Sequence, residues 1–138
     1  MSIKEFRGAV FEEVDAWQRA NFPDLRIVYQ NAPDYDESEA TAKPWADVEL
    51  NFYAGTATSL GADAKGRHHG TLTLSLYHRK GEGTADTDDL LDSFSKHFRL
   101  KRIGGGLLKM PKYVQSNEFK GWYTGGVVVP CHFDENRG

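Results

Sequence analysis

The tract from residue 70 to residue 98 constrains the fold most strongly. Apolar and polar residues alternate from Thr71 to Arg79, which is the pattern of a half-buried strand. The Gly81-Glu82-Gly83 turn allows a sharp change of direction, because glycine adopts backbone conformations that other residues avoid. Thr84 or Asp86 is predicted to cap the helix that follows. The apolar face of that helix comprises Leu90, Leu91, Phe94 and Phe98.

Two further segments precede this tract. Residues 2–21 are predicted to form a helix, because apolar residues recur at steps of three or four: Ile3, Phe6, Val10, Val14 and Trp17. A short strand is expected at 25–29, and residues 46–53 alternate as a second half-buried strand. We expect the strands at 46–53 and 71–79 to be antiparallel neighbours, joined by a loop over 55–67.

The remainder of the chain is predicted to be β structure. Gly104 to Gly106 form a turn, and Pro111 confines the next segment to an edge or a bend. Residues 122–133 form a long strand with a break at Gly125-Gly126. With 138 residues, of which 39% are hydrophobic, the chain is expected to be one domain spanning 1–138. The fold class is α+β, with a mainly antiparallel sheet packed against two principal helices.

The sequence offers no pattern typical of catalysis or metal binding. Adjacent strand residues point to opposite faces, so neither the pair His68 and His69 nor the pair Cys131 and His132 acts as a unit. His78 and His132 are expected to stand alone, and no metal motif accompanies them. Cys131 is the sole cysteine, which excludes an internal disulfide and fits a reducing compartment. We expect neither an enzyme nor a cofactor.

Charge is distributed unevenly along the chain. Residues 1–63 carry 12 acids and 5 bases, whereas residues 64–138 carry 8 acids and 12 bases. Such blocks occur on ordinary solvated surfaces, and they also suit a ring in which an acidic face of one subunit meets a basic face of the next. Aromatic residues are interleaved with the basic stretch from residue 96 to 122, as in single-strand nucleic-acid binders, although the net charge is −3.

Several short strings, in order along the chain, carry a family resemblance. They are Asn-Phe-Pro at 21–23, Tyr-Gln-Asn-Ala-Pro at 29–33, Gly-Thr-Leu-Thr-Leu-Ser-Leu-Tyr at 70–77, Gly-Trp-Tyr at 121–123 and Val-Val-Val-Pro-Cys-His-Phe at 127–133. With a strand after Pro44-Trp45, a Gly-x-Gly turn and an Asp-rich helix start, the chain resembles the tail terminator (tail completion) proteins of long-tailed bacteriophages and prophages.

The resemblance implies a structural virion protein rather than an enzyme, with no catalytic residues and no cofactor. It implies a compact α+β fold and a hexameric ring that caps the finished tail tube and ends its polymerisation. The implied partners are further copies of the chain, the tail tube protein and the head–tail connector, while DNA passes through the ring lumen without specific binding. The implied location is the virion tail, assembled in the host cytoplasm, with no membrane association.

Three sets of residues are predicted to serve such a ring. The loop over 31–43 is the candidate lumen wall or acidic interface, through Asp34, Asp36, Glu37 and Glu39. The loop over 55–67 and its end are the candidate contact with the tube, through Lys65, Arg67 and His68. The candidate subunit interface is basic and comprises Lys96, Arg99, Lys101 and Arg102.

Other functions stay open on the sequence alone. Another head–tail connector, neck or tube ring protein is the nearest alternative, and a tube subunit would polymerise into long tubes instead of stopping at one ring. A small-molecule binding α+β module would need a concave pocket with convergent polar groups. A single-stranded nucleic-acid binding module would lose affinity steeply with salt.

Overall fold

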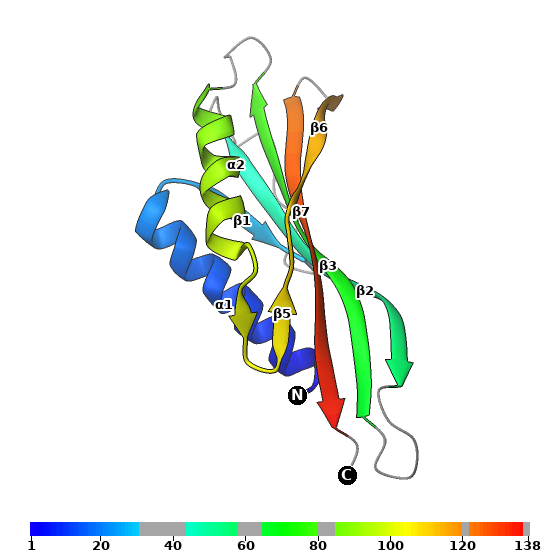
Figure 1. Ribbon diagram of the computed structural model, residues 1–138. Helices are drawn as coiled ribbons and strands as arrows, with labels where there is room; N and C mark the ends of the chain where they lie inside the picture. Colours follow the sequence, from blue (N-terminus) through cyan, green and yellow to red (C-terminus); the bar gives the residue numbers. More distant parts are fainter. Residues whose placement is uncertain (31–43, 58–64, 80–84, 120–121, 137–138) are drawn as a thin grey trace.

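Two helices lie on one face of a mainly antiparallel, curled sheet (Figure 1). The computed structural model describes residues 1–30, 44–57, 65–79, 85–119 and 122–136. The elements in order are α1 (Ile3–Asn21), β1 (Arg26–Tyr29), β2 (Trp45–Ala57), β3 (Lys65–Arg79), α2 (Ala85–Phe98), β4 (Arg102–Ile103), β5 (Gly106–Leu108), β6 (Lys112–Phe119) and β7 (Trp122–Asn136). The predicted α+β class is confirmed.

The sheet is built around the pair β3 and β7. Its strand order is β1-β2-β3-β7-β5-β4, and β6 also pairs with β7. β1 runs parallel to β2, whereas every other pairing is antiparallel. β3 and β7 pair from Lys65↔Asn136 to Arg79↔Trp122, so both 15-residue strands are matched along their full length.

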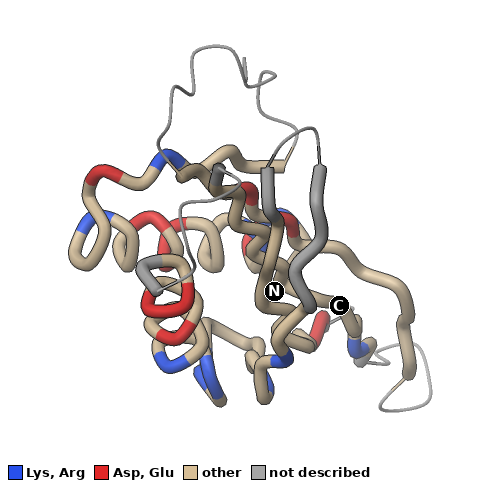
Figure 2. The backbone as a smooth tube through the Cα atoms, turned by 90° about the horizontal axis from the view of Figure 1, so that it is seen from above, with Lys and Arg blue, Asp and Glu red and all other residues tan. Residues whose placement is uncertain are grey.

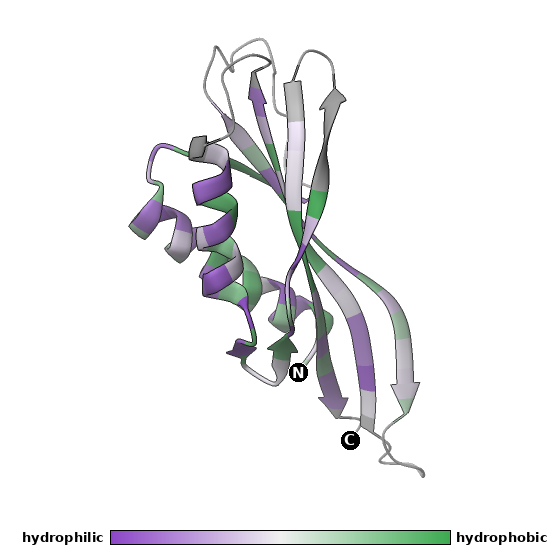
Figure 3. Cartoon of the chain, turned by 45° about the horizontal axis from the view of Figure 1, so that its top comes forward, coloured by the Kyte–Doolittle hydropathy of each residue, from purple (hydrophilic) through white to green (hydrophobic). Residues whose placement is uncertain are grey.

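The register confirms the predicted sheet face. Val48 lies opposite Leu74 and Leu50 opposite Leu72, so the two alternating patterns bury the same side. From α1 the fully buried positions are Phe6, Val10, Val14 and Trp17. The hydrophobic positions of α2 turn toward the sheet in Figure 3. They include Leu90, Leu91, Phe94 and Phe98, as predicted.

Helix α1 begins at a serine cap and ends shortly before a proline. The Ser2 side chain accepts a hydrogen bond from the Glu5 backbone N–H at 3.1 Å, which caps the first turn. The helix ends at Asn21, just before Phe22 and Pro23. Ile3 was predicted on the buried face but is 40% exposed, because it lies in the first turn, before the buried stripe begins.

The predicted loop over 55–67 is wrong at both ends. β2 continues to Ala57 and β3 begins at Lys65, with pairs from Ala54↔His69 to Ala57↔Gly66. Continuous pairing satisfies the backbone polar groups and overrides the weak strand preference of glycine and alanine. The register shifts between Phe52 and Ala54, which is a β-bulge where β2 leaves the core.

The predicted break in β7 is also wrong. Gly125 pairs with Leu76 and Gly126 with Ser75, so the strand passes through both glycines without a shift in its register on β3. A Cβ at Gly126 would lie 2.5 Å from the Leu74 carbonyl oxygen, so glycine permits a close approach of two backbones there. The irregularity lies instead in β6, between Val114 and Asn117. The predicted turn at Gly104 is confirmed, with φ at +57°.

Candidate functional site

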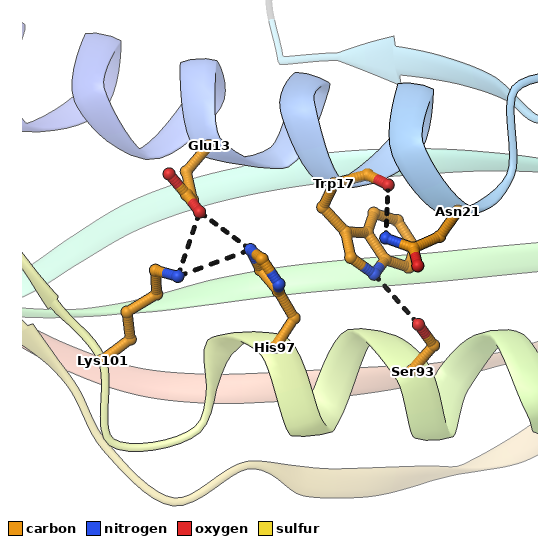
Figure 4. Close-up of polar contacts among 6 residues, drawn as sticks. All are labelled: Glu13, Trp17, Asn21, Ser93, His97 and Lys101. Atoms are coloured by element: carbon orange, nitrogen blue, oxygen red, sulfur yellow. Dashed lines mark hydrogen bonds and ion pairs between the residues drawn. The ribbon is translucent and has the colours of Figure 1, made fainter.

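A carboxylate on α1 contacts a histidine in the last turn of α2 and a lysine just beyond that helix (Figure 4). Glu13 Oε1 lies 2.8 Å from His97 Nε2 and 3.0 Å from Lys101 Nζ. Hydrogen bonds from Lys101, and then from His97, hold the pKa of the Glu13 carboxyl below its ordinary value. Lys101 was predicted at a subunit interface, but its ammonium group is already engaged inside the chain.

A groove between the helices runs beside this cluster. Trp17 Nε1 donates to Ser93 Oγ at 3.1 Å, and Asn21 Nδ2 donates to the Trp17 carbonyl oxygen at 2.9 Å (Figure 4). The groove has a volume of about 480 Å³ and is lined by Trp17, Asn21, Asp89, Asp92, Ser93, Lys96 and His97. Most of these side chains are polar, so the lining offers hydrogen-bonding groups beside the apolar surface.

A second groove lies between the end of α1 and the start of α2. It has a volume of about 470 Å³, and its lining is mainly apolar with two carboxylates at exposed positions. The lining residues are Asn21, Phe22, Pro23, Asp24, Leu25, Pro44, Thr87, Asp89 and Leu90. This surface had no signal in the sequence, because its two walls come from segments that are about sixty residues apart.

The charges along α2 are segregated. Asp88 and Asp89 are exposed in its first half and Asp92 just past its middle, whereas Lys96 is exposed in its last turn and Arg99 directly after it. Figure 2 shows the acidic (red) and basic (blue) backbone positions of the molecule seen from above. Lys96, Arg99 and Arg102 are exposed, as a subunit interface requires, and Lys101 is half-buried against Glu13.

Arg67 lies in a strand and not in the predicted contact loop. Its Nε and Nη2 lie 2.8 Å and 3.1 Å from the two carboxylate oxygens of Asp134 on β7. The hydrogen bond to Asp134 raises the pKa of the Arg67 guanidinium. Lys65 begins the same strand. The predicted contact set is therefore partly engaged across the β3–β7 pair.

His68 is likewise held within the sheet. Its Nε2 lies 2.7 Å from Glu135 Oε2, and its ring stacks on Phe133 with centroids 5.0 Å apart. His69 points to the other face, as predicted for an adjacent strand residue. The expectation that His132 stands alone is wrong, because His132 lies opposite His69 with ring centroids 6.0 Å apart.

The sheet face away from the helices carries polar side chains beside a small aromatic cluster around Trp45. Burial raises the pKa of Asp47, which accepts a hydrogen bond from the Tyr77 hydroxyl at 2.9 Å. The Tyr77 ring stacks on Trp45 with centroids 4.2 Å apart. Glu49 and Asn51 share this face, as the alternation predicted.

Cys131 is 1% exposed, and burial raises the pKa of its thiol to about 11. Cys131 and His132 lie on opposite faces of β7 and do not form a dyad.

Across the described ranges, no group of three or more His, Cys, Asp or Glu side chains is placed to hold a metal ion. Neither of the helices in those ranges has the length and apolar content to cross a membrane. The predicted lumen residues Asp34, Asp36, Glu37 and Glu39 lie outside the described residues.

Comparison with known proteins supports the fold. One solved structure aligns with 100% of this chain and 99% of its own, at a TM-score of 0.67 and 14% sequence identity. The name recorded for that structure states no function. No family model matches the chain, and no curated protein matches it.

Proposed function

We propose that the protein is a structural component of a bacteriophage or prophage tail, which caps the tail tube as a ring and presents the surface for head–tail joining. Its partners are then further copies of itself, the tube protein and the connector, with DNA passing through the lumen. The resemblance of five strings in order along the chain carries this proposal. The α+β arrangement that the resemblance implied agrees with the observed helices and sheet.

The segregated charge of α2 supports assembly from head to tail. A ring of identical subunits needs two unlike patches on each copy, because a heterologous contact joins different surfaces. Acidic residues at one end of α2 and basic residues at the other supply such patches. Contact between unlike charges favours one relative orientation over others.

Tube growth tests the proposal. The purified protein is added to growing tubes of the tail tube protein from the same phage, and tube length and tube ends are followed by negative-stain electron microscopy. We expect capped ends, arrested growth and discrete rings. Tubes that continue to lengthen at saturating protein would contradict the proposal, and long tubes formed by this protein alone would identify a tube subunit.

The salt dependence of oligonucleotide binding distinguishes a tail terminator from a single-stranded nucleic-acid binding module. Binding of a single-stranded oligonucleotide is measured as salt is raised, because contacts to phosphates weaken steeply with salt. A terminator ring is expected to bind the oligonucleotide weakly at every salt concentration. Tight binding at low salt, with a steep loss as salt rises, would favour the single-strand binding function.

A further inference from the structure

Leu100 combines a left-handed backbone conformation with an exposed apolar side chain. It has φ at +49°, in the left-handed region that glycine normally occupies at the end of a helix. Its side chain is also 61% exposed. A non-glycine residue with positive φ is uncommon and calls for an explanation, and exposed apolar side chains that lie near one another mark candidate contact surfaces.

The surroundings of Leu100 form a small apolar knob with a basic border. The Leu100 N–H donates to the Lys109 carbonyl oxygen at 3.3 Å, which places Leu100 beside the segment that continues to Met110. Met110 is 53% exposed. Arg99 is exposed next to Leu100 in the chain, and Lys109 is half-buried. We call Leu100, Met110 and Arg99 the knob.

The groove of about 470 Å³ at the other end of α2 has the complementary character. Its apolar lining includes Pro23, Leu25 and Leu90, and its carboxylates Asp24 and Asp89 are exposed. An apolar residue bordered by a cation therefore finds both an apolar floor and a carboxylate there. The groove is large enough for a leucine side chain together with part of its neighbours.

One chain cannot fill its own groove with its own knob. Leu90 lines the groove and Leu100 follows the end of the same helix, ten residues later. At about 1.5 Å of rise per residue, the two are separated by about 15 Å along α2, and the helix holds them apart. A second copy satisfies both surfaces at once, and repetition of this contact joins unlike patches from head to tail.

We propose that Leu100 of one copy inserts into the groove between α1 and α2 of a second copy, with Arg99 facing Asp24 or Asp89. This inference rests on the proposed ring function and identifies the subunit contact that would build the ring. The left-handed backbone at Leu100 is then the conformation that projects the side chain outward.

Two single substitutions test the contact from its two sides. Leu100→Gly removes the knob and suits the left-handed backbone, so the fold is retained. Asp24→Lys reverses a charge on the exposed edge of the groove. The matched controls are Tyr53→Ala, which removes an exposed apolar side chain elsewhere, and Glu12→Lys, which makes the same charge change on the exposed side of α1.

Self-association of the full chain is measured by sedimentation velocity over a concentration series, with circular dichroism as the check on folding. We expect the wild type to associate, and each test substitution to weaken association by about tenfold or more, while both controls match the wild type. A mixture of the two test variants is expected to stop at pairs, because only one intact knob and one intact groove remain to meet.

Any of three outcomes would overturn the inference. The first is a wild type that stays monomeric up to about 1 mM, and the second is association that is unchanged by Leu100→Gly. The third is a pair of test variants that self-associate like the wild type and lose only the binding of tube protein. Rings that form without regard to Leu100 would remove this contact and leave the proposed function standing. Association that depends on Leu100 but yields neither rings nor capped tubes would support the contact and contradict the proposed function.

Discussion

A single carboxylate oxygen connects the two helices. Glu13 is 84 residues before His97, and both His97 and Lys101 reach its Oε1. The three side chains are about one-third exposed, so the cluster is partly desolvated and more stabilising than a pair in open solvent. The lowered pKa of Glu13 records this stabilisation of the charged form.

Glu13→Gln is expected to lower the free energy of unfolding by about 1 kcal/mol at neutral pH, because a neutral amide attracts the Lys101 ammonium group less strongly and is a weaker hydrogen-bond partner for His97. The pKa of Glu13 in the folded protein lies below its ordinary value of 4.5, so the stabilisation is complete above that pH. It is lost as the pH falls through the lower folded pKa. Urea unfolding at neutral pH and at acid pH measures the difference.

Glu12→Gln is the matched control, because Glu12 precedes Glu13 in α1 and is exposed. We expect this variant to unfold like the wild type at both pH values. Equal losses for the two substitutions would show that the Glu13 cluster contributes no more to stability than any surface charge.

Glycines within the elements have opposite roles. A Cβ at Gly70 on β3 would collide with the Asn51 carbonyl oxygen and would lie 2.8 Å from Phe52 Cδ1. A Cβ at Gly8 on α1 would meet nothing within 4 Å. The first glycine is required by the close approach of β2 and β3, whereas the second only weakens its helix.

Gly70→Ala is therefore expected to lower the unfolding free energy by about 1–3 kcal/mol, since the two strands must move apart. Gly8→Ala is expected to raise it by about 1 kcal/mol, because alanine favours the helix. Thermal and urea unfolding of the two variants measure both shifts. A stable Gly70→Ala protein would contradict the close backbone approach at that pair of strands.

Strand register provides a second test at the level of elements. Leu74 is fully buried, so Leu74→Asp places an unpaired carboxylate in the core and is expected to unfold the chain. Thr71→Asp, on the opposite face of β3, is the control and is expected to fold. Far-ultraviolet circular dichroism shows whether each variant folds. A folded Leu74→Asp protein would show that the register of β3 is wrong by one residue.

The elements that the sequence predicted are those with strong periodicity. The buried stripe of α1 from Phe6 to Trp17 and the alternation over 46–53 and 71–79 were predicted correctly, because burial on one face forces those spacings. The extension of β2 to Ala57 was missed, since Ala54, Gly55 and Ala57 have weak strand preference and pair only because β3 is beside them. The break predicted at Gly125-Gly126 was wrong, because β7 pairs with β3 through both residues and Gly126 permits a close approach of the two backbones.

The candidate site was less predictable than the fold. The basic cluster after α2 was visible in the sequence, but no local pattern shows that Lys101 pairs with Glu13, 88 residues away. His69 and His132 meet only through the β3–β7 register. The groove at Asp24 and Asp89 arises from the packing of α1 against α2, which no spacing along the chain encodes.

Across the whole molecule, stability is expected to decrease from the centre of the sheet toward the far end of β2. β3 lies between β2 and β7, whereas β1 pairs with β2 only from Trp45 to Val48. Within the described residues, the segment from Phe52 to Ala57 is therefore paired on one side alone.

Amide hydrogen exchange measured residue by residue tests this gradient. Backbone amides from Leu72 to Leu76 are expected to exchange most slowly, at rates set by global unfolding. Amides from Ala54 to Ala57 are expected to exchange faster, through local opening. Equal protection in both segments would indicate that another part of the chain, or another copy, covers the edge of β2.

The position of β7 has a consequence for synthesis on the ribosome. This strand lies between β3 on one side and β5 and β6 on the other, yet it is translated after all of them. Because translation adds about 5–20 residues per second, several seconds pass between the synthesis of β3 and the synthesis of β7. A nascent chain that stops before Trp122 has therefore made both helices and most strands but lacks the strand that joins them, so the sheet is completed only after β7 has been synthesised.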